Sequence, residues 1–179
     1  MPIVSYEADA TLCPAYSDIA KMFPGNVLRD VYMVLAAVDA GGIDAAALIR
    51  NRDYHTLFLL SCGLAVSIMA YGTPHPGVLR LMESPVPAED PGDYGGLDAD
   101  VAEGVHEGLG IPREFLKDIQ SFRGSLLLGQ VHSADMYMAQ GDYASCYLLS
   151  AAQMLHRYTT GADIRVFSPH GGFDNVVKD

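Results

Sequence analysis

Two histidine–carboxylate pairs are the strongest candidates for chemistry in this chain of 179 residues. The first is His132 with Asp135, in a segment, 124–140, that has no other charged side chain. Residues three apart share one face of a helix, so we expect the carboxylate to hold the imidazole in one tautomer. Such a pair could serve as a general base with its orienting acid. A structural bond between two helices, or a surface pair facing water, fits the same spacing.

The second pair, Glu103 with His106, has the Glu-x-x-His spacing that places both side chains on one helical face. Di-iron bundles use this spacing twice, with two further glutamates, and no second Glu-x-x-His is present in this sequence. We therefore expect Glu103 and His106 to be secondary acid–base residues. A single metal ion is the other use of these side chains, with ligands drawn from His55, His106, His132 and Asp135. The sequence itself requires no cofactor.

Tyrosines and one histidine are the candidate contacts for a bound molecule, namely Tyr137, Tyr143, Tyr147 and His55. The three cysteines stand at positions 13, 62 and 146, without a Cys-x-x-Cys pair, which argues against a disulfide framework or a cysteine-rich zinc site. Cys62 and Cys146 lie in apolar segments. Cysteines in such surroundings act as small, inert hydrophobic side chains.

The elements that must position these residues are helical almost throughout. Apolar periodicity, proline starts and glycine stops predict helices over residues 14–23, 27–39, 43–50, 53–71, 76–83, 98–109, 112–140 and 143–158. Gly124 and Gly129 are the points where the long segment after Pro112 could kink or split. The predicted fold class is an all-α bundle of about seven to eight helices. Residues 1–161 would form one helical domain, and residues 162–179 a short irregular tail with room for one strand at 164–167.

Charge is unevenly distributed along the chain. The sequence has 22 acidic and 11 basic residues, a formal net charge of -11, and the stretch 83–107 holds eight of the acids with no lysine or arginine. This balance argues against sequence-independent nucleic-acid binding and against adhesion to anionic lipid. The Pro- and Gly-rich loop 84–97 lacks the EF-hand spacing, so we interpret it as a solvated acidic loop.

Three predicted helical segments, 56–71, 124–140 and 143–155, carry almost no charge on any side. One small domain can enclose a single such helix completely, so three of them predict that another copy of the chain covers a face. A small apolar ligand or a different partner protein would serve the same purpose. A monomer whose Ser, Thr, Gln and Tyr side chains form the outer face is the remaining alternative.

Residues 31–49 and 131–149 share a pattern of apolar helix, glycine turn and small-residue helix at an offset of 100 residues. This pattern predicts two similar helical hairpins. The segment 141–155 is similar to the turn and second helix of a tetratricopeptide unit. Cys146 and Gln153 stand where that family prefers alanine, and no 34-residue period recurs, so we do not assign the family.

The apolar run 57–71 is shorter than the roughly 20 residues that cross a bilayer, and the first residues do not have the pattern of a secretory signal. We therefore expect a cytoplasmic, homo-oligomeric protein that binds neither membrane nor nucleic acid. The leading hypothesis is a metabolic enzyme that performs proton transfer, isomerisation or hydration on a small apolar substrate between helices. The alternative is a non-catalytic helical-hairpin module that binds a partner or a ligand.

Overall fold

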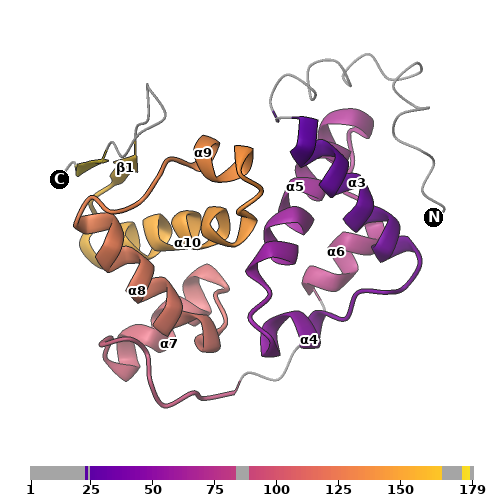
Figure 1. The fold of residues 1–179 in the computed structure, drawn as a ribbon. Helices are drawn as coiled ribbons and strands as arrows, with labels where there is room; N and C mark the ends of the chain where they lie inside the picture. Colours follow the sequence, from indigo (N-terminus) through magenta and orange to yellow (C-terminus); the bar gives the residue numbers. More distant parts are fainter. Residues whose placement is uncertain (1–22, 24, 84–88, 167–174, 178–179) are drawn as a thin grey trace. The chain divides into compact units, whose positions relative to one another are not determined.

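The computed structural model describes residues 23, 25–83, 89–166 and 175–177. These residues form eight α-helices, one short 3-10 helix and a small antiparallel hairpin near the C-terminus (Figure 1). The predicted all-α fold of seven to eight helices is confirmed. Nearly all of the helix predicted over 14–23 lies outside the described residues.

The chain divides into two compact units, Met1–Val86 and Pro87–Asp179. The single helical domain predicted over residues 1–161 therefore comprises one such unit and most of the second. The division falls within the Pro- and Gly-rich loop 84–97, in which Gly92, Gly95 and Gly96 all have positive φ angles. Backbone of this kind favours turns over helix, so it separates the helices on either side.

The first unit contains α3 (Gly25–Asp39), α4 (Ala45–Arg50), α5 (Tyr54–Tyr71) and α6 (Pro76–Glu83). Helix α3 packs along α5, and α6 contacts both of them (Figure 1). Asp53 caps α5 by accepting the backbone N–H of Thr56 at 3.0 Å, and Gly72 ends the helix at φ 77°. The predicted cap and stop of this helix are thus both present.

The second unit contains α7 (Ala99–Leu109), η1 (Arg113–Phe115), α8 (Leu116–Leu127), α9 (Ala134–Ala139) and α10 (Tyr143–Thr160). Helix α10 packs along α8 and also contacts α7 and α9 (Figure 1). Strand β1 (Ile164–Val166) pairs antiparallel with β2 (Asn175–Val177). The tail therefore has the expected strand and a second one that the sequence pattern did not indicate.

The two units contain the same succession of three helices. Helix α3 has 15 residues, and η1 with α8 together cover the 15 residues Arg113–Leu127. Helices α4 and α9 have six residues each, and α5 and α10 have 18 each. The principal packing in each unit joins the first of these helices to the third. We call α3–α4–α5 and α8–α9–α10 the two repeats.

Their turns and caps agree in detail. Asp142 accepts the backbone N–H and the hydroxyl of Ser145, just as Asp53 accepts those of Thr56. The residue before each aspartate has a positive φ angle, 52° at Arg52 and 72° at Gly141. Short matches accompany the geometry, such as Leu-Arg-Asp-Val at 28–31 with Leu-Lys-Asp-Ile at 116–119, and Leu-Leu-Ser at 59–61 with 148–150.

The buried faces of the repeats also correspond. In α5 the buried positions 54, 60, 62, 63, 66 and 67 match 143, 149, 151, 152, 155 and 156 in α10, which are buried as well. On the first helix, Val27, Leu28, Val31 and Leu35 form the buried side. Their equivalents are Phe115, Leu116 and Ile119, all buried, and then Arg123. One core leucine of the first repeat is therefore an arginine in the second.

One expectation about these helices was wrong. The hairpins offset by 100 residues are not equivalent, because α3–α4 is a long helix before a short one and α9–α10 is the reverse. The long segment after Pro112 splits near Gly129, one of the two glycines at which the sequence allowed a break. Helix α8 ends at Leu127, Gly129 has a φ of 72°, and Ser133 caps a separate helix by accepting the N–H of Met136.

Candidate functional site

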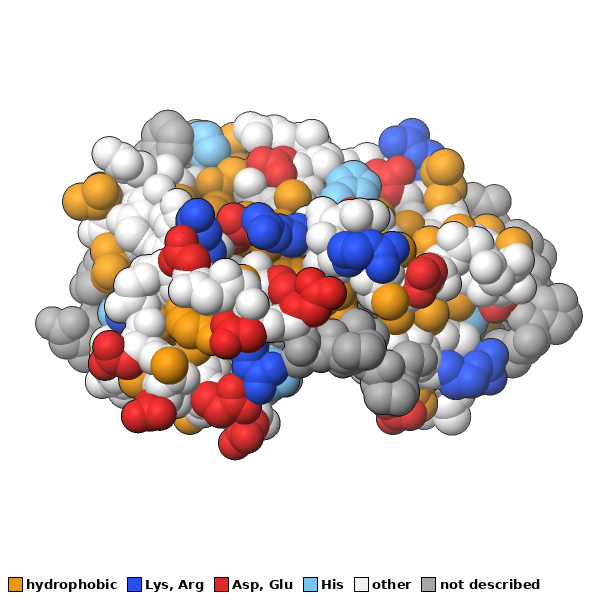
Figure 2. Space-filling model, turned by 90° about the horizontal axis from the view of Figure 1, so that it is seen from below, with side chains coloured by type: hydrophobic (Ala, Val, Ile, Leu, Met, Phe, Trp, Pro, Cys, Tyr) orange, Lys and Arg blue, Asp and Glu red, His pale blue; other side chains and the backbone are white. Residues whose placement is uncertain are grey.

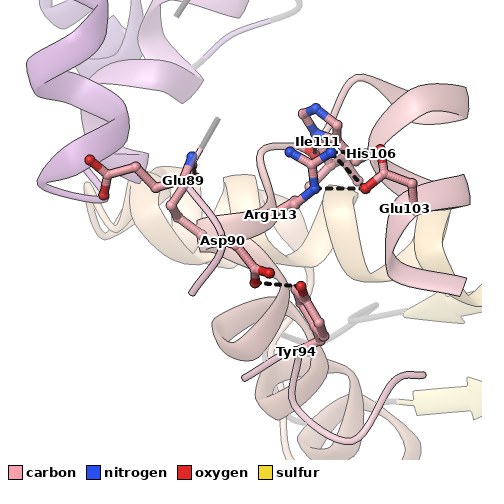
Figure 3. Close-up of polar contacts among 8 residues, drawn as sticks. Glu89, Asp90, Tyr94, Glu103, His106, Ile111 and Arg113 are labelled. Atoms are coloured by element: carbon pink, nitrogen blue, oxygen red, sulfur yellow. Dashed lines mark hydrogen bonds and ion pairs between the residues drawn. The ribbon is translucent and has the colours of Figure 1, made fainter. Parts of the chain in front are cut away.

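The most extensive polar cluster among the predicted site residues lies on α7 and the turn after it (Figure 3). The Glu103 carboxylate accepts hydrogen bonds from Nε of Arg113 at 2.8 Å and from its terminal nitrogen at 2.6 Å. This bidentate ion pair ties α7 to η1. The hydrogen bonds from Arg113 hold the pKa of Glu103 below its ordinary value, so the carboxylate stays ionised and is a weak base.

His106 closes the same turn. Its Nδ1 lies 2.8 Å from the carbonyl oxygen of Ile111, which can only accept, so Nδ1 carries the proton (Figure 3). Gly110 ends α7 in the left-handed conformation just before this contact. In the neutral ring, Nε2 then holds a lone pair that could accept a proton or bind a metal ion.

A second polar contact lies in the acidic loop beside this cluster. The Tyr94 hydroxyl donates to the Asp90 carboxylate at 2.5 Å (Figure 3). That hydrogen bond lowers the pKa of Asp90 and raises the pKa of Tyr94. The loop is held to the helices by an ion pair between Asp93 and Lys117 at 3.2 Å and by the backbone N–H of Glu89, which donates to Glu114. The described part of this loop, residues 89–97, is largely exposed, as its composition predicted.

His132 and Asp135 do not share a helix. His132 precedes α9, where its backbone N–H donates to the hydroxyl oxygen of Tyr137 at 3.0 Å and its ring packs edge-on against the tyrosine ring. Asp135 lies in the first turn of α9 and is exposed. Because the chain is not helical between Leu127 and Ala134, helical spacing does not hold the His132 ring against the Asp135 carboxylate.

The candidate ligand-binding tyrosines belong mainly to the core of the second unit. Tyr143 is fully buried at the start of α10, and Tyr137 is buried against Phe122. Tyr147 packs edge-on against Phe115, and burial raises its pKa to about 12. His55 is exposed in the first turn of α5, in the other unit. The four side chains are therefore not gathered in one place within either unit.

The two cysteines in the described part of the chain have the inert surroundings that were expected. Cys62 and Cys146 are buried free thiols on α5 and α10. Burial raises the pKa of Cys62 to about 12, which keeps the thiol protonated and unreactive near neutral pH. Within the described ranges, no group of three or more His, Cys, Asp or Glu side chains is arranged to hold a metal ion.

One buried polar cluster in the first unit was not predicted. His75 is 2% exposed, and its Nδ1 accepts the backbone N–H groups of Gly77 at 3.1 Å and Val78 at 3.3 Å. Its Nε2 lies 3.1 Å from the Asp39 carboxylate. His75 thus joins the end of α3 to the start of α6, where its Nδ1 caps the first turn of α6. Its Nε2 faces the Asp39 carboxylate without forming a hydrogen bond.

A second unpredicted contact is the pair formed by Arg123 on α8 and His156 on α10. Nε of Arg123 donates to Nδ1 of His156 at 3.0 Å, and its terminal nitrogen donates to Oε1 of Gln120 at 3.1 Å. Two residues 33 positions apart give no local sequence signal. Comparison of the two repeats does distinguish this pair, because the equivalent positions in the first repeat hold the non-ionisable residues Leu35 and Ser67.

Charged side chains of both signs and hydrophobic side chains are interspersed on the face of the molecule in Figure 2. One helix of the described part of the chain, α5, is long and apolar enough to span a membrane, and 39% of it is buried in the protein.

Comparison with known protein families, with curated protein sequences and with solved structures finds no match to this chain.

Proposed function

We propose that this chain is a non-catalytic, cytoplasmic helical module that associates with a second copy of itself through the open side of α5. The acid–base enzyme hypothesis receives less support from the geometry. Asp135 is exposed at the start of a separate helix, and Glu103 is engaged by Arg113. Neither pair joins a histidine to a carboxylate that is available as its partner.

The observation that carries this proposal is an uncharged stripe along α5. Positions 57, 61, 64, 68 and 71 recur at helical spacing, and none of them is buried. Ile68 is 48% exposed and Tyr71 is 42% exposed. No Asp, Glu, Lys or Arg occurs anywhere on this helix. We call these five residues the α5 stripe.

The second repeat supports the view that the fold does not require this stripe to be apolar. The positions of α10 equivalent to Leu64, Ile68 and Tyr71 hold Gln153, Arg157 and Thr160. Arg157 is exposed and pairs with Asp163. The same helix thus folds with a polar outer side in one unit, so the apolar side in the other is available for a binding role.

A second copy is the occupant that an uncharged stripe on an acidic chain best accommodates. The chain carries a formal net charge of -11, so two copies repel each other across most of their surfaces. The α5 stripe allows two copies to approach without carboxylates facing each other. A twofold arrangement would place the stripe of one copy on that of the other and remove both from water. A small apolar ligand and an unrelated partner protein are competing occupants.

The substitution Ile68→Arg tests this proposal, because it introduces the residue that the second repeat carries at this position. We expect the purified chain to sediment as a dimer at micromolar concentration and the variant to sediment as a monomer with unchanged helical circular dichroism. Placing a desolvated charge in an apolar interface should weaken association at least tenfold. The matched control is Leu128→Arg, which charges a residue that is 73% exposed outside this helix and should leave the dimer intact.

A monomeric wild-type chain, or an Ile68→Arg variant that remains dimeric, would contradict the proposal. Partition of the wild-type chain into membranes without detergent would also contradict it. A monomer that carries a co-purified apolar molecule would favour a small ligand as the occupant instead.

A further inference from the structure

We infer that the surface formed by α7 and α10 binds a basic amphipathic helix of a partner protein. Three exposed apolar side chains define this surface, namely Val101 on α7 and Met154 and Tyr158 on α10. We call these three residues the α7–α10 face. The face belongs to the second unit and shares no residue with the α5 stripe, so its test is separate from that of the proposed dimer.

The three apolar side chains lie on one side of the helix pair. A Cβ built at Gly104 would lie 2.9 Å from the Tyr158 hydroxyl oxygen, and one built at Gly108 would lie 3.3 Å from Cε2 of the same ring. The tyrosine ring therefore lies against α7 at two glycines one turn apart. Val101 comes three residues before Gly104 on the same side of α7, and Met154 comes one turn before Tyr158 on α10.

Tyr158 has the properties of an anchor for a binding partner. Its contact with α7 fixes the ring, yet 48% of the residue remains exposed. Met154 is 46% exposed and Val101 is 37% exposed. A tyrosine held in place before binding loses little conformational entropy when a partner covers it, and a methionine adapts to the shape of that partner. Tyrosine and methionine are both enriched in protein interfaces.

Carboxylates border this face along α7. Positions 100, 104 and 107 recur at helical spacing, so Asp100 and Glu107 lie one turn before and one turn after Gly104. Both acids are exposed, and the sequence of α7 contains no lysine or arginine. On α10, Arg157 faces the Asp163 carboxylate at 3.8 Å. An apolar surface beside exposed carboxylates is complementary to a partner that carries Lys or Arg next to apolar side chains.

The stability of α7 does not account for Glu107. Asp100 lies in the first turn, where a negative charge interacts favourably with the helix dipole. Glu107 lies in the last turn, where a negative charge is unfavourable, and four residues after Glu103, a spacing at which two acids repel each other. A cation on a partner would offset both effects.

Charge also selects the kind of partner. The stretch 83–107 holds eight acids and no lysine or arginine, so two copies that met through this region would bring carboxylates against carboxylates. The same repulsion acts against an anionic lipid surface. An amphipathic helix can place apolar side chains on the α7–α10 face while its basic side chains reach the carboxylates of α7. A lysine or arginine of that helix could also lie over the ring of Tyr158.

The test measures the binding of three fluorescent peptides to the full-length chain by anisotropy. The peptides are designed helices that share one leucine face and carry lysine, glutamine or glutamate at the remaining positions. We expect saturable one-to-one binding of the lysine peptide and loss of that binding in about 0.5 M sodium chloride. The glutamine and glutamate peptides should bind at least tenfold more weakly.

A pair of double variants tests the contribution of charge at this face. Asp100→Asn combined with Glu107→Gln should weaken binding of the lysine peptide at least tenfold. Glu83→Gln combined with Asp135→Asn removes the same charge from exposed positions on α6 and α9 and should leave binding unchanged.

A second pair tests the apolar contact. Met154→Gln should weaken binding about fivefold, because it places an amide where the partner's apolar side chains lie. Leu128→Gln changes a more exposed apolar residue outside the face and should have no effect. All of these substitutions are at exposed positions, and circular dichroism should show unchanged helix content.

Three results would overturn the inference. Absence of saturable binding, or equal binding by the Asp100→Asn, Glu107→Gln chain, would show that the face does not recognise a basic helix. Equal binding of the glutamine peptide would indicate an uncharged partner. Self-association of the wild-type chain that Met154→Gln abolishes would show that a second copy covers the face.

Discussion

Among individual residues, Glu103 illustrates how a plausible catalytic side chain can be committed to structure. Its carboxylate accepts both donor groups of Arg113, and the contact holds the first turn after α7. His106 contributes to the same turn through the Ile111 carbonyl. The spacing of Glu103 and His106 correctly indicated a shared helical face. The arginine that occupies the carboxylate comes from beyond the helix, where helical spacing gives no information.

The Glu103→Gln substitution should therefore have an effect that depends on pH. Arg113 lowers the pKa of Glu103 in the folded chain, so the ionised carboxylate stabilises the fold at pH values above its unfolded pKa. That contribution is lost as the pH falls through the folded pKa. We expect Glu103→Gln to lower the melting temperature modestly at pH 7 and to have no effect near pH 2.

Thermal unfolding at several pH values measures this difference, with Glu83→Gln as the control for loss of one exposed carboxylate. A Glu103→Gln deficit that persisted unchanged at low pH would show that the ion pair is not its cause.

At the level of the helices, two glycines differ in how closely other side chains pack against them. A Cβ added at Gly63 on α5 would lie 2.9 Å from Cδ2 of the fully buried Leu35. A Cβ added at Gly124 on α8 would meet nothing within 4 Å. The first glycine allows α3 and α5 to approach closely, whereas the second only weakens its own helix.

Alanine at these two positions should change stability in opposite directions. We expect Gly124→Ala to stabilise the chain by about 0.5–1 kcal/mol through helix propensity. Gly63→Ala gains the same propensity but forces Leu35 to move, which costs roughly 1–3 kcal/mol, so the net effect should be destabilising. Urea unfolding of both variants measures the difference. Equal stabilisation by both would refute the close packing of α3 on α5.

Much of the element order was predictable from local signals. Asp53 and Asp142 cap helices, and Gly72, Gly110 and Gly161 end helices in the left-handed conformation, as their positions in the sequence indicate. The break after Leu127 was harder to place, because the apolar pattern continues through it. The contacts of His75 and Arg123 join helices that are far apart in the sequence, so no local pattern reveals them.

The whole molecule consists of two compact units with separate buried cores. Val27, Val31 and Leu35 lie in the first core, and Phe115, Leu116 and Ile119 lie in the second. Each core is formed by helices that are consecutive in the chain, so its contacts are local in sequence. Units of this kind can fold without the rest of the chain.

We therefore expect the fragments 1–86 and 87–179, expressed separately, to be helical and to unfold cooperatively. Each buries a smaller share of its surface than the full chain, so each should melt at a lower temperature. Circular dichroism and calorimetry of both fragments are the measurements. Two fragments without cooperative transitions would mean that neither core is sufficient by itself.

The two repeats also bear on how the protein could have acquired new properties. An ancestral gene copied once and joined head to tail would produce matching helices, turns and caps of this kind. Such redundancy relaxes selection on each half, because one half can preserve the original scaffold while the other diverges. The left-handed turn before the third helix is where such divergence would show, because Gly141 adopts this conformation without steric conflict whereas the Cβ of Arg52 makes it costly.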